Sequence, residues 1–143
     1  MKVCFDSSVL VAAVVDQLSN HESACACFVQ YSQGKHHGCC STHALAECYA
    51  TLTALPLPRK IKATEALILI EENFIKRLEI LKLTQADYAA AITRSSQLGL
   101  VSGVVYDALH LVAAERAGCQ RIYTYNLAHF QRLQPHGIIV TAP

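Results

Sequence analysis

Short apolar runs alternate along this chain with longer helical patterns, and this alternation restricts the possible folds more than any other feature. Such runs, bounded by polar or turn-forming residues, are typical of buried parallel strands. Strands that are joined by helices favour an α/β sheet covered on both faces. We predict strands at residues 2–5, 37–40, 78–81, 120–124 and 137–140, and helices at residues 7–16, 22–32, 42–55, 60–74, 85–99, 105–117 and 127–133.

The composition is that of a folded chain with little net charge. The 143 residues match one typical domain, so we expect a single domain over residues 1–143. Apolar residues make up 52% and charged residues 16%, which argues against long disordered stretches. The net charge of +1 argues against binding nucleic acid through bulk charge. The apolar run at residues 9–15 is too short for a membrane span or a signal core, so we expect a cytoplasmic protein.

The seven cysteines are an odd number and lie mostly in apolar segments, which suits buried thiols in a reducing compartment. A zinc site is the alternative, because histidines 36, 37 and 43 lie close to Cys39 and Cys40 in sequence. The cysteine spacings lack the C-x2-C pattern of common structural zinc sites, so buried thiols are the favoured interpretation.

Four polar residues are predicted to gather at one edge of the sheet. Ligands of open parallel sheets bind outside the carboxyl ends of the strands. Asp6 directly follows the first strand, and Asn126 follows the fourth. Glu47 lies in the helix after the second strand, and Asp107 lies in the first turn of a later helix. These segments can therefore bring three carboxylates and an amide to one site.

Each of these residues also has an ordinary structural explanation. Asp6 can be a helix N-cap, Asp107 can favour a helix dipole, and Asn126 can be a turn residue. Glu47 can be an exposed glutamate of an amphipathic helix. However, its neighbours are mostly apolar, and a buried carboxylate needs a partner such as a cation. By helical spacing, His43 and Thr51 share the face of Glu47.

Converging carboxylates favour metal-dependent chemistry. Carboxylates repel one another, and Mg2+ or Mn2+ relieves the repulsion with hard oxygen ligands. The sequence has no G-x-S-x-G, Walker A or G-x-G-x-x-G motif. Ser8 stands where a phospho-aspartate enzyme would carry a second acid. A divalent metal site is therefore the leading prediction.

Four sequence blocks carry a family resemblance. They are FDSSVLV at residues 5–11, Ala46-Glu47, YDALH at residues 106–110 and YTYNLAHF at residues 123–130. In order and spacing they resemble the signature blocks of the PIN-domain family, and most closely its bacterial VapC-type toxins. The resemblance covers essentially the whole chain. It implies a three-layer α/β/α sandwich with a five-stranded parallel sheet.

The resemblance also implies a Mg2+- or Mn2+-dependent endoribonuclease. Asp6, Glu47 and Asp107 match the acids that hold the metal in the family. Asn126 matches a fourth position that is often aspartate, so we count it among the catalytic residues, and its neutral amide favours one firmly held ion. Ser8 and Thr124 match supporting hydroxyl positions.

Partners and rival functions follow from the same resemblance. It implies an RNA substrate, a protein antitoxin and a homodimer, and helix 60–74 is either part of a partner groove or ordinary core. The alternatives are a catalytically weak binding module and a nuclease that acts on DNA or in RNA processing. His110 and His129 are interpreted as structural. Candidate contacts to the RNA backbone are Lys35, His36, His37, Arg94 and Arg121.

Overall fold

The computed structural model describes residues 1–33 and 37–143, which leaves Lys35 and His36 outside the described residues. Its centre is a parallel sheet of five strands in the order β3-β2-β1-β4-β5. The strands are β1 (Lys2–Phe5), β2 (His37–Ser41), β3 (Glu79–Leu81), β4 (Arg121–Tyr123) and β5 (Ile139–Thr141).

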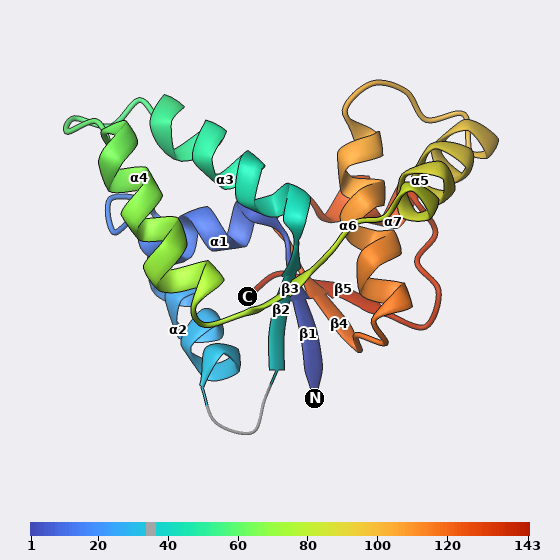
Figure 1. The fold of residues 1–143 in the computed structure, drawn as a ribbon, viewed down its shortest axis with the longest axis horizontal. Helices are drawn as coiled ribbons and strands as arrows, with labels where there is room; N and C mark the ends of the chain where they lie inside the picture. The colour runs from blue at the N-terminus through green and yellow to red at the C-terminus, as the bar shows by residue number, and fades with distance from the viewer. Residues whose placement is uncertain (34–36) are drawn as a thin grey trace.

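Helices cover both faces of this sheet. Figure 1 shows α1 to α4 on one side and α5 to α7 on the other. The three layers confirm the predicted α/β/α sandwich with a five-stranded parallel sheet. The helices are α1 (Ser7–Val14), α2 (His21–Ser32), α3 (Thr42–Ala54), α4 (Ala63–Leu69), α5 (Gln85–Gln97), α6 (Val104–Arg116), α7 (Leu127–Arg132) and the π-helix η1 (Ile70–Ile75).

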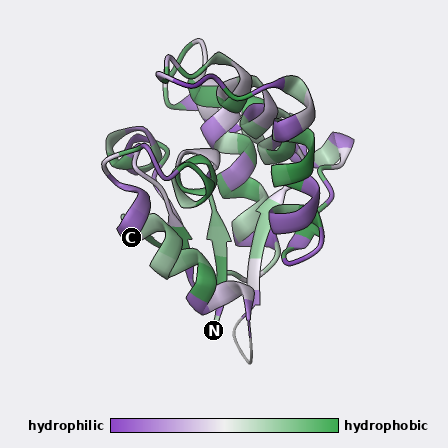
Figure 2. Cartoon of the chain, turned by 90° about the vertical axis from the view of Figure 1, so that its left-hand side faces the viewer, coloured by the Kyte–Doolittle hydropathy of each residue, from purple (hydrophilic) through white to green (hydrophobic). Residues whose placement is uncertain are grey.

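Successive side chains of each strand point to opposite layers, and this alternation divides the core. Phe5 of β1 packs with the α1–α4 layer, whereas the neighbouring Cys4 packs with the α5–α7 layer. In Figure 2 hydrophobic residues run along the strands, while the helices carry both hydrophobic and hydrophilic turns. A glycine allows one close approach: a Cβ at Gly38 would lie 2.9 Å from the carbonyl oxygen of Tyr31 and 3.0 Å from the Phe5 ring.

Each predicted element exists, and the largest error concerns the helix expected at residues 60–74. Residues 60–62 are not helical, because Lys62 is the N-cap position and its backbone N–H donates to Glu65. From Ile70 to Ile75 the helix widens into η1, which keeps Ile70 and Phe74 buried. Helix α1 ends at Val14 rather than Asp16. No helix among the described residues is long and apolar enough to cross a membrane.

Candidate metal centre

Asp6 is held at the carboxyl end of β1 by two hydroxyl groups. Its backbone N–H donates to the Tyr123 carbonyl oxygen of β4 at 3.0 Å, which continues the ladder beyond the strand. Its side chain is buried and makes no cap hydrogen bond, so the N-cap explanation does not account for the carboxylate. Instead, Oδ2 accepts hydrogen bonds from Ser8 Oγ and Thr124 Oγ1, both at 2.8 Å.

Glu47 reaches the same place from α3. The helix begins after β2 because Ser41 caps it, and its Oγ accepts a hydrogen bond from the Ala44 N–H at 3.2 Å. One and a half turns later, Glu47 Oε1 lies 2.5 Å from His110 Nε2. The Glu47 side chain is 27% exposed, so it is neither buried nor free on the surface. The predicted proximity of His43 holds, with Nε2 at 3.9 Å from Glu47 Oε2.

His110 is the residue that sequence reasoning missed. It lies on α6 and is fully buried, with Nε2 at 3.7 Å from Asp6 Oδ1 as well as beside Glu47. Its Nδ1 lies 2.8 Å from Ser41 Oγ. The interpretation of His110 as structural stays a prediction, although the ring lies beside two of the predicted acids. A signal existed in the sequence, since His110 stands three residues after Asp107 on one helix face.

Asp107 and Asn126 complete the site at its outer side. Asp107 is 9% exposed, and its Oδ2 lies 3.2 Å from Nδ1 of His129. Asn126 is exposed, and its Nδ2 lies 3.5 Å from Asp6 Oδ2, at the limit of a hydrogen bond. Its backbone N–H donates to Thr124 Oγ1 at 2.9 Å. The structure thus places all four predicted residues at one edge of the sheet.

Asp6, Glu47, Asp107 and His110 are called the acid cluster below. One ligand atom each from Asp6, Glu47 and His110 lies within 4.8 Å of the others. Among the described residues, this is the one group of three or more His, Cys, Asp or Glu side chains with that spacing. Converging carboxylate oxygens fit a small divalent cation with hard ligands. The donor set therefore suits Mg2+ or Mn2+.

Burial and neighbouring charges shift several pKa values in the acid cluster. Burial and the negative charge of Asp6 raise the pKa of Asp107 to about 6. Burial opposes the charged forms of Glu47 and His110 as well. Their mutual hydrogen bond and opposite charges outweigh it, so the pKa of Glu47 is lowered and that of His110 is raised. The protein thus compensates Glu47 internally, whereas Asp107 holds its proton more tightly than an ordinary aspartate.

Two aromatic rings border the cluster. The His43 ring stacks on Tyr106 with ring centroids 5.1 Å apart and an angle of 18° between the planes. Tyr106 is 48% exposed and directly precedes Asp107. The open side of the site therefore has an aromatic rim.

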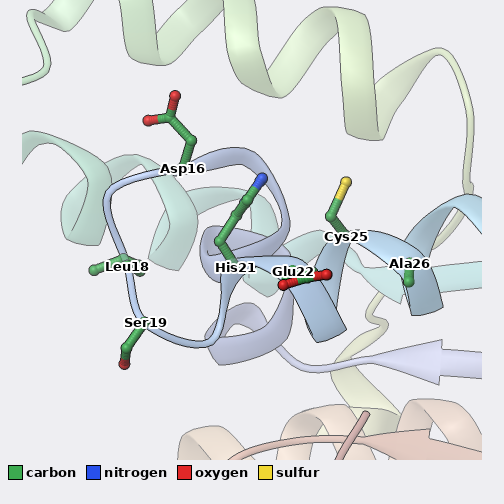
Figure 3. A pocket seen from close by; sticks show the side chains of 7 residues that line it. All are labelled: Asp16, Leu18, Ser19, His21, Glu22, Cys25 and Ala26. Atoms are coloured by element: carbon green, nitrogen blue, oxygen red, sulfur yellow. The ribbon is translucent and has the colours of Figure 1, made fainter.

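A pocket of about 640 Å3 lies elsewhere, at the loop between α1 and α2 (Figure 3). None of the acid cluster lines it, and His21 is already tied to the Ala12 carbonyl oxygen at 2.8 Å. We therefore place the chemistry at the acid cluster and not at this pocket. The lining residues are Asp16, Leu18, Ser19, His21, Glu22, Cys25 and Ala26.

The predicted RNA contacts lose their support where the structure describes them. His37 and Arg121 begin β2 and β4, at the sheet edge opposite the acid cluster. Arg94 donates to the carbonyl oxygens of Leu133 and Gln134 and to Glu115, so it ties α5 to its neighbours. These arginine and histidine side chains are therefore not available beside the acids.

The cysteines follow the prediction of buried thiols. Cys4, Cys39, Cys40, Cys48 and Cys119 are buried, and Cys25 and Cys27 are partly buried. Cys39 Sγ lies 3.4 Å from Cys119 Sγ on the α5–α7 side of the sheet. These thiols are part of the packed core.

Residues 3–134 match the family model of the PIN domain. No curated protein matches the chain. Solved structures with similar folds include VapC20 of Mycobacterium tuberculosis, described as a sarcin–ricin loop cleaving toxin. It has a TM-score of 0.74 and 15% identity over 95% of this chain and 98% of that one.

Two further similar structures are of VapBC assemblies. VapBC2 of Rickettsia felis, bound to a DNA fragment from the promoter, has a TM-score of 0.69 and 18% identity over 100% of both chains. VapBC-1 of nontypeable Haemophilus influenzae has a TM-score of 0.68 and 14% identity over 99% of this chain and 98% of that one. At such identities the similarity establishes a shared fold.

Proposed function

Because the chain belongs to the PIN-domain family, we propose that it is a Mg2+- or Mn2+-dependent endoribonuclease and the toxin of a toxin–antitoxin pair. The observation that carries the proposal is the convergence of Asp6 and Glu47 with His110 at the carboxyl ends of β1 and β2, with Asp107 beside them. Such a site needs a cation and offers the ligands for one.

In this proposal, Asp6, Glu47 and Asp107 hold the ion. A bound divalent ion supplies positive charge that favours ionisation of water and stabilises charge developing on a phosphate. Ser8 and Thr124 fix the Asp6 carboxylate by their hydrogen bonds to Oδ2. The partly exposed Glu47 can also orient the attacking water, and the exposed Asn126 amide can reach a phosphate oxygen.

A protein antitoxin and a second copy of this chain are the proposed partners. Two similar structures are VapBC assemblies, which supports the antitoxin. Helix α4 and η1 expose Leu67, Ile68 and Ile75, which supports a protein contact on this layer. Co-purification with a small protein encoded by a neighbouring gene is the expected result. Harmless overexpression without such a partner would count against the toxin role.

The test of the activity is cleavage of RNA in Mg2+ by wild type, Asp6→Asn and Asp107→Asn. We expect cleavage by the wild type and its loss in both variants, because each removes a charge from the site. Equal cleavage by all three would refute the assignment. Cleavage of DNA in preference to RNA would favour a different nuclease role.

The neutral amide of Asn126 favours one rival, a catalytically weak module that holds RNA or protein in the same cleft. Calorimetry with Mg2+ separates the two, because a site that binds no ion cannot run this chemistry. We expect the wild type to bind Mg2+.

A further inference from the structure

His110 engages both of its ring nitrogens, and each partner belongs to a different part of the site. Nε2 lies 2.5 Å from Glu47 Oε1, and Nδ1 lies 2.8 Å from Ser41 Oγ. The ring is completely buried, and it comes from α6, whereas both partners come from β2 and α3. The histidine therefore links the helix that carries Asp107 to the helix that carries Glu47.

The chemistry of the partners assigns the proton on Nε2. An ionised carboxylate can only accept, so Nε2 must donate to Glu47. In the neutral ring Nδ1 accepts from the Ser41 hydroxyl, and in the charged ring Nδ1–H donates to Ser41 Oγ. The Ser41 oxygen also accepts the Ala44 N–H at 3.2 Å. In either form, one hydrogen-bond chain runs from the start of α3 to the Glu47 carboxylate.

We propose that His110 is a positioning residue that is held by Ser41 and fixes the Glu47 carboxylate for metal binding. The inference rests on the proposed metal-dependent nuclease activity. Glu47 has a long side chain and is partly exposed, so it can turn toward solvent unless something holds it. The buried ring of His110 cannot move in the same way, because neighbouring side chains enclose it.

The two acids are held in parallel ways. Ser8 and Thr124 hold Oδ2 of Asp6, and its Oδ1 lies 3.7 Å from His110 Nε2. His110 holds Oε1 of Glu47, and its Oε2 lies 3.9 Å from His43 Nε2. Both longer distances exceed a hydrogen bond, so neither histidine occupies Asp6 Oδ1 or Glu47 Oε2. Partners behind metal ligands commonly orient them in this manner.

The competing assignment makes His110 itself a metal ligand. Its Nε2 does lie within 4.8 Å of ligand atoms of Asp6 and Glu47. A ligating Nε2 would have to give up its proton and its bond to Glu47. The short contact between Nε2 and Glu47 Oε1 therefore favours positioning over ligation.

The test measures Mn2+ binding by electron paramagnetic resonance in the whole protein without RNA, beside RNA cleavage. His110→Leu removes the donor and should weaken Mn2+ binding about 10- to 100-fold. His110→Gln keeps an amide N–H near the position of Nε2 and should restore most of the affinity. Ser41→Ala removes the hydroxyl that holds Nδ1 of His110 without touching an acid, and it should weaken binding by a smaller factor.

Thr84→Ala is the matched control for Ser41→Ala. Thr84 caps α5 and accepts the Asp87 N–H at 3.2 Å, which is the distance of the Ser41 cap. This variant loses a helix cap and should bind Mn2+ as the wild type does. If His110→Leu does not fold, His110→Gln and Ser41→Ala decide the question.

Several results would overturn the inference. If His110→Leu binds Mn2+ as tightly as the wild type, the His110 ring is an ordinary core residue. If Ser41→Ala and Thr84→Ala bind Mn2+ equally well, the Ser41 hydroxyl has no role in metal binding. His110 would be a metal ligand if electron spin echo envelope modulation showed a nitrogen bound directly to Mn2+ and if His110→Gln bound Mn2+ as weakly as His110→Leu. A wild-type protein that binds no Mn2+ would refute the proposed function itself, a result distinct from any difference among variants.

Discussion

Two clusters of ionisable side chains meet at β1, where Cys4 and Asp6 are two residues apart, yet the clusters have opposite properties. The first, here called the thiol cluster, consists of Cys4 of β1, Cys39 of β2 and Cys119. A hydrogen bond with Cys39 and burial raise the pKa of the Cys119 thiol far above its ordinary value. The thiol cluster is therefore neutral, and close packing with a few thiol hydrogen bonds satisfies it.

The acid cluster cannot be neutral in this way. Glu47 keeps its charge through His110, and Asp6 is bonded to two hydroxyls. Burial makes thiols into core residues, but it makes carboxylates depend on donors and cations. We therefore expect metal binding to depend on the acid cluster and not on the thiol cluster.

The largest expected effect is that of Asp6→Asn on RNA cleavage. The change removes one charge from a buried ligand position, and even partners behind a metal ligand contribute about 10- to 100-fold. We expect a loss of more than about 100-fold, measured as initial rates on an RNA oligonucleotide in Mg2+. Asp16→Asn, an exposed aspartate outside the acid cluster, is the control and should cleave normally. Similar cleavage rates for Asp6→Asn and Asp16→Asn would show that the acid cluster has no special role in cleavage.

Asp107 gives the acid cluster a pH dependence that the thiol cluster lacks near neutrality. Its pKa is raised from 3.8 to about 6, so the native state binds the proton more tightly than the unfolded chain. In metal-free protein, the Asp107 contribution is favourable below about pH 4 and is lost as pH rises through about 6. The gap corresponds to roughly 3 kcal/mol at most.

Asp107→Asn should remove this dependence. In EDTA, its melting temperature relative to wild type should rise between pH 4 and pH 8. In Mg2+ at pH 8, the wild type should be stabilised more than the variant, because the ion replaces the proton. A constant difference in melting temperature across this pH range, with or without Mg2+, would show that the neighbouring carboxylates do not affect Asp107.

Asn126→Asp should have a moderate effect on the Mg2+ concentration that cleavage requires. Asn126 Nδ2 lies 3.5 Å from Asp6 Oδ2, so an aspartate would add a fourth negative charge beside it. We expect a several-fold lower Mg2+ concentration for half-maximal cleavage. Asn126→Ala is the companion variant and should not show this gain. An unchanged Mg2+ requirement in Asn126→Asp would place the residue outside the metal site.

The smallest functional effect is expected in the thiol cluster. Cys39→Ala removes a buried sulfur and should lower the free energy of unfolding by about 1 kcal/mol, measured by urea denaturation. Cleavage and Mn2+ affinity should stay within about twofold of wild type, since no metal ligand is touched. A large loss of cleavage by folded Cys39→Ala would show that cleavage depends on the thiol cluster as well as on the acid cluster.

The fold was predictable because its signals are local. Apolar runs placed most elements within a few residues, and the structure shows local caps at the starts of α3 and α5, Ser41 and Thr84. The start of α4 and the π-helix were not predictable in this way. The first depends on how Lys62 and Glu65 meet. The second lies where Phe74 packs against Phe28 of α2, which is far away in sequence.

The site was predictable only in part. The topology brings Asp6 to the carboxyl edge, and the family resemblance marks Glu47 and Asp107. His110 gave a periodic signal beside Asp107, but its contact with Glu47 depends on the approach of α3 and α6. Sequence separation of 63 residues hides such a contact from any local pattern.

The central claim is that the acid cluster binds a divalent ion. Calorimetric titration of Mn2+ into wild type and Asp6→Asn tests it most directly. We predict a binding event in the wild type that is lost in Asp6→Asn and retained in Asp16→Asn. Absence of binding to the wild type, or equal affinity in all three proteins, would contradict the claim.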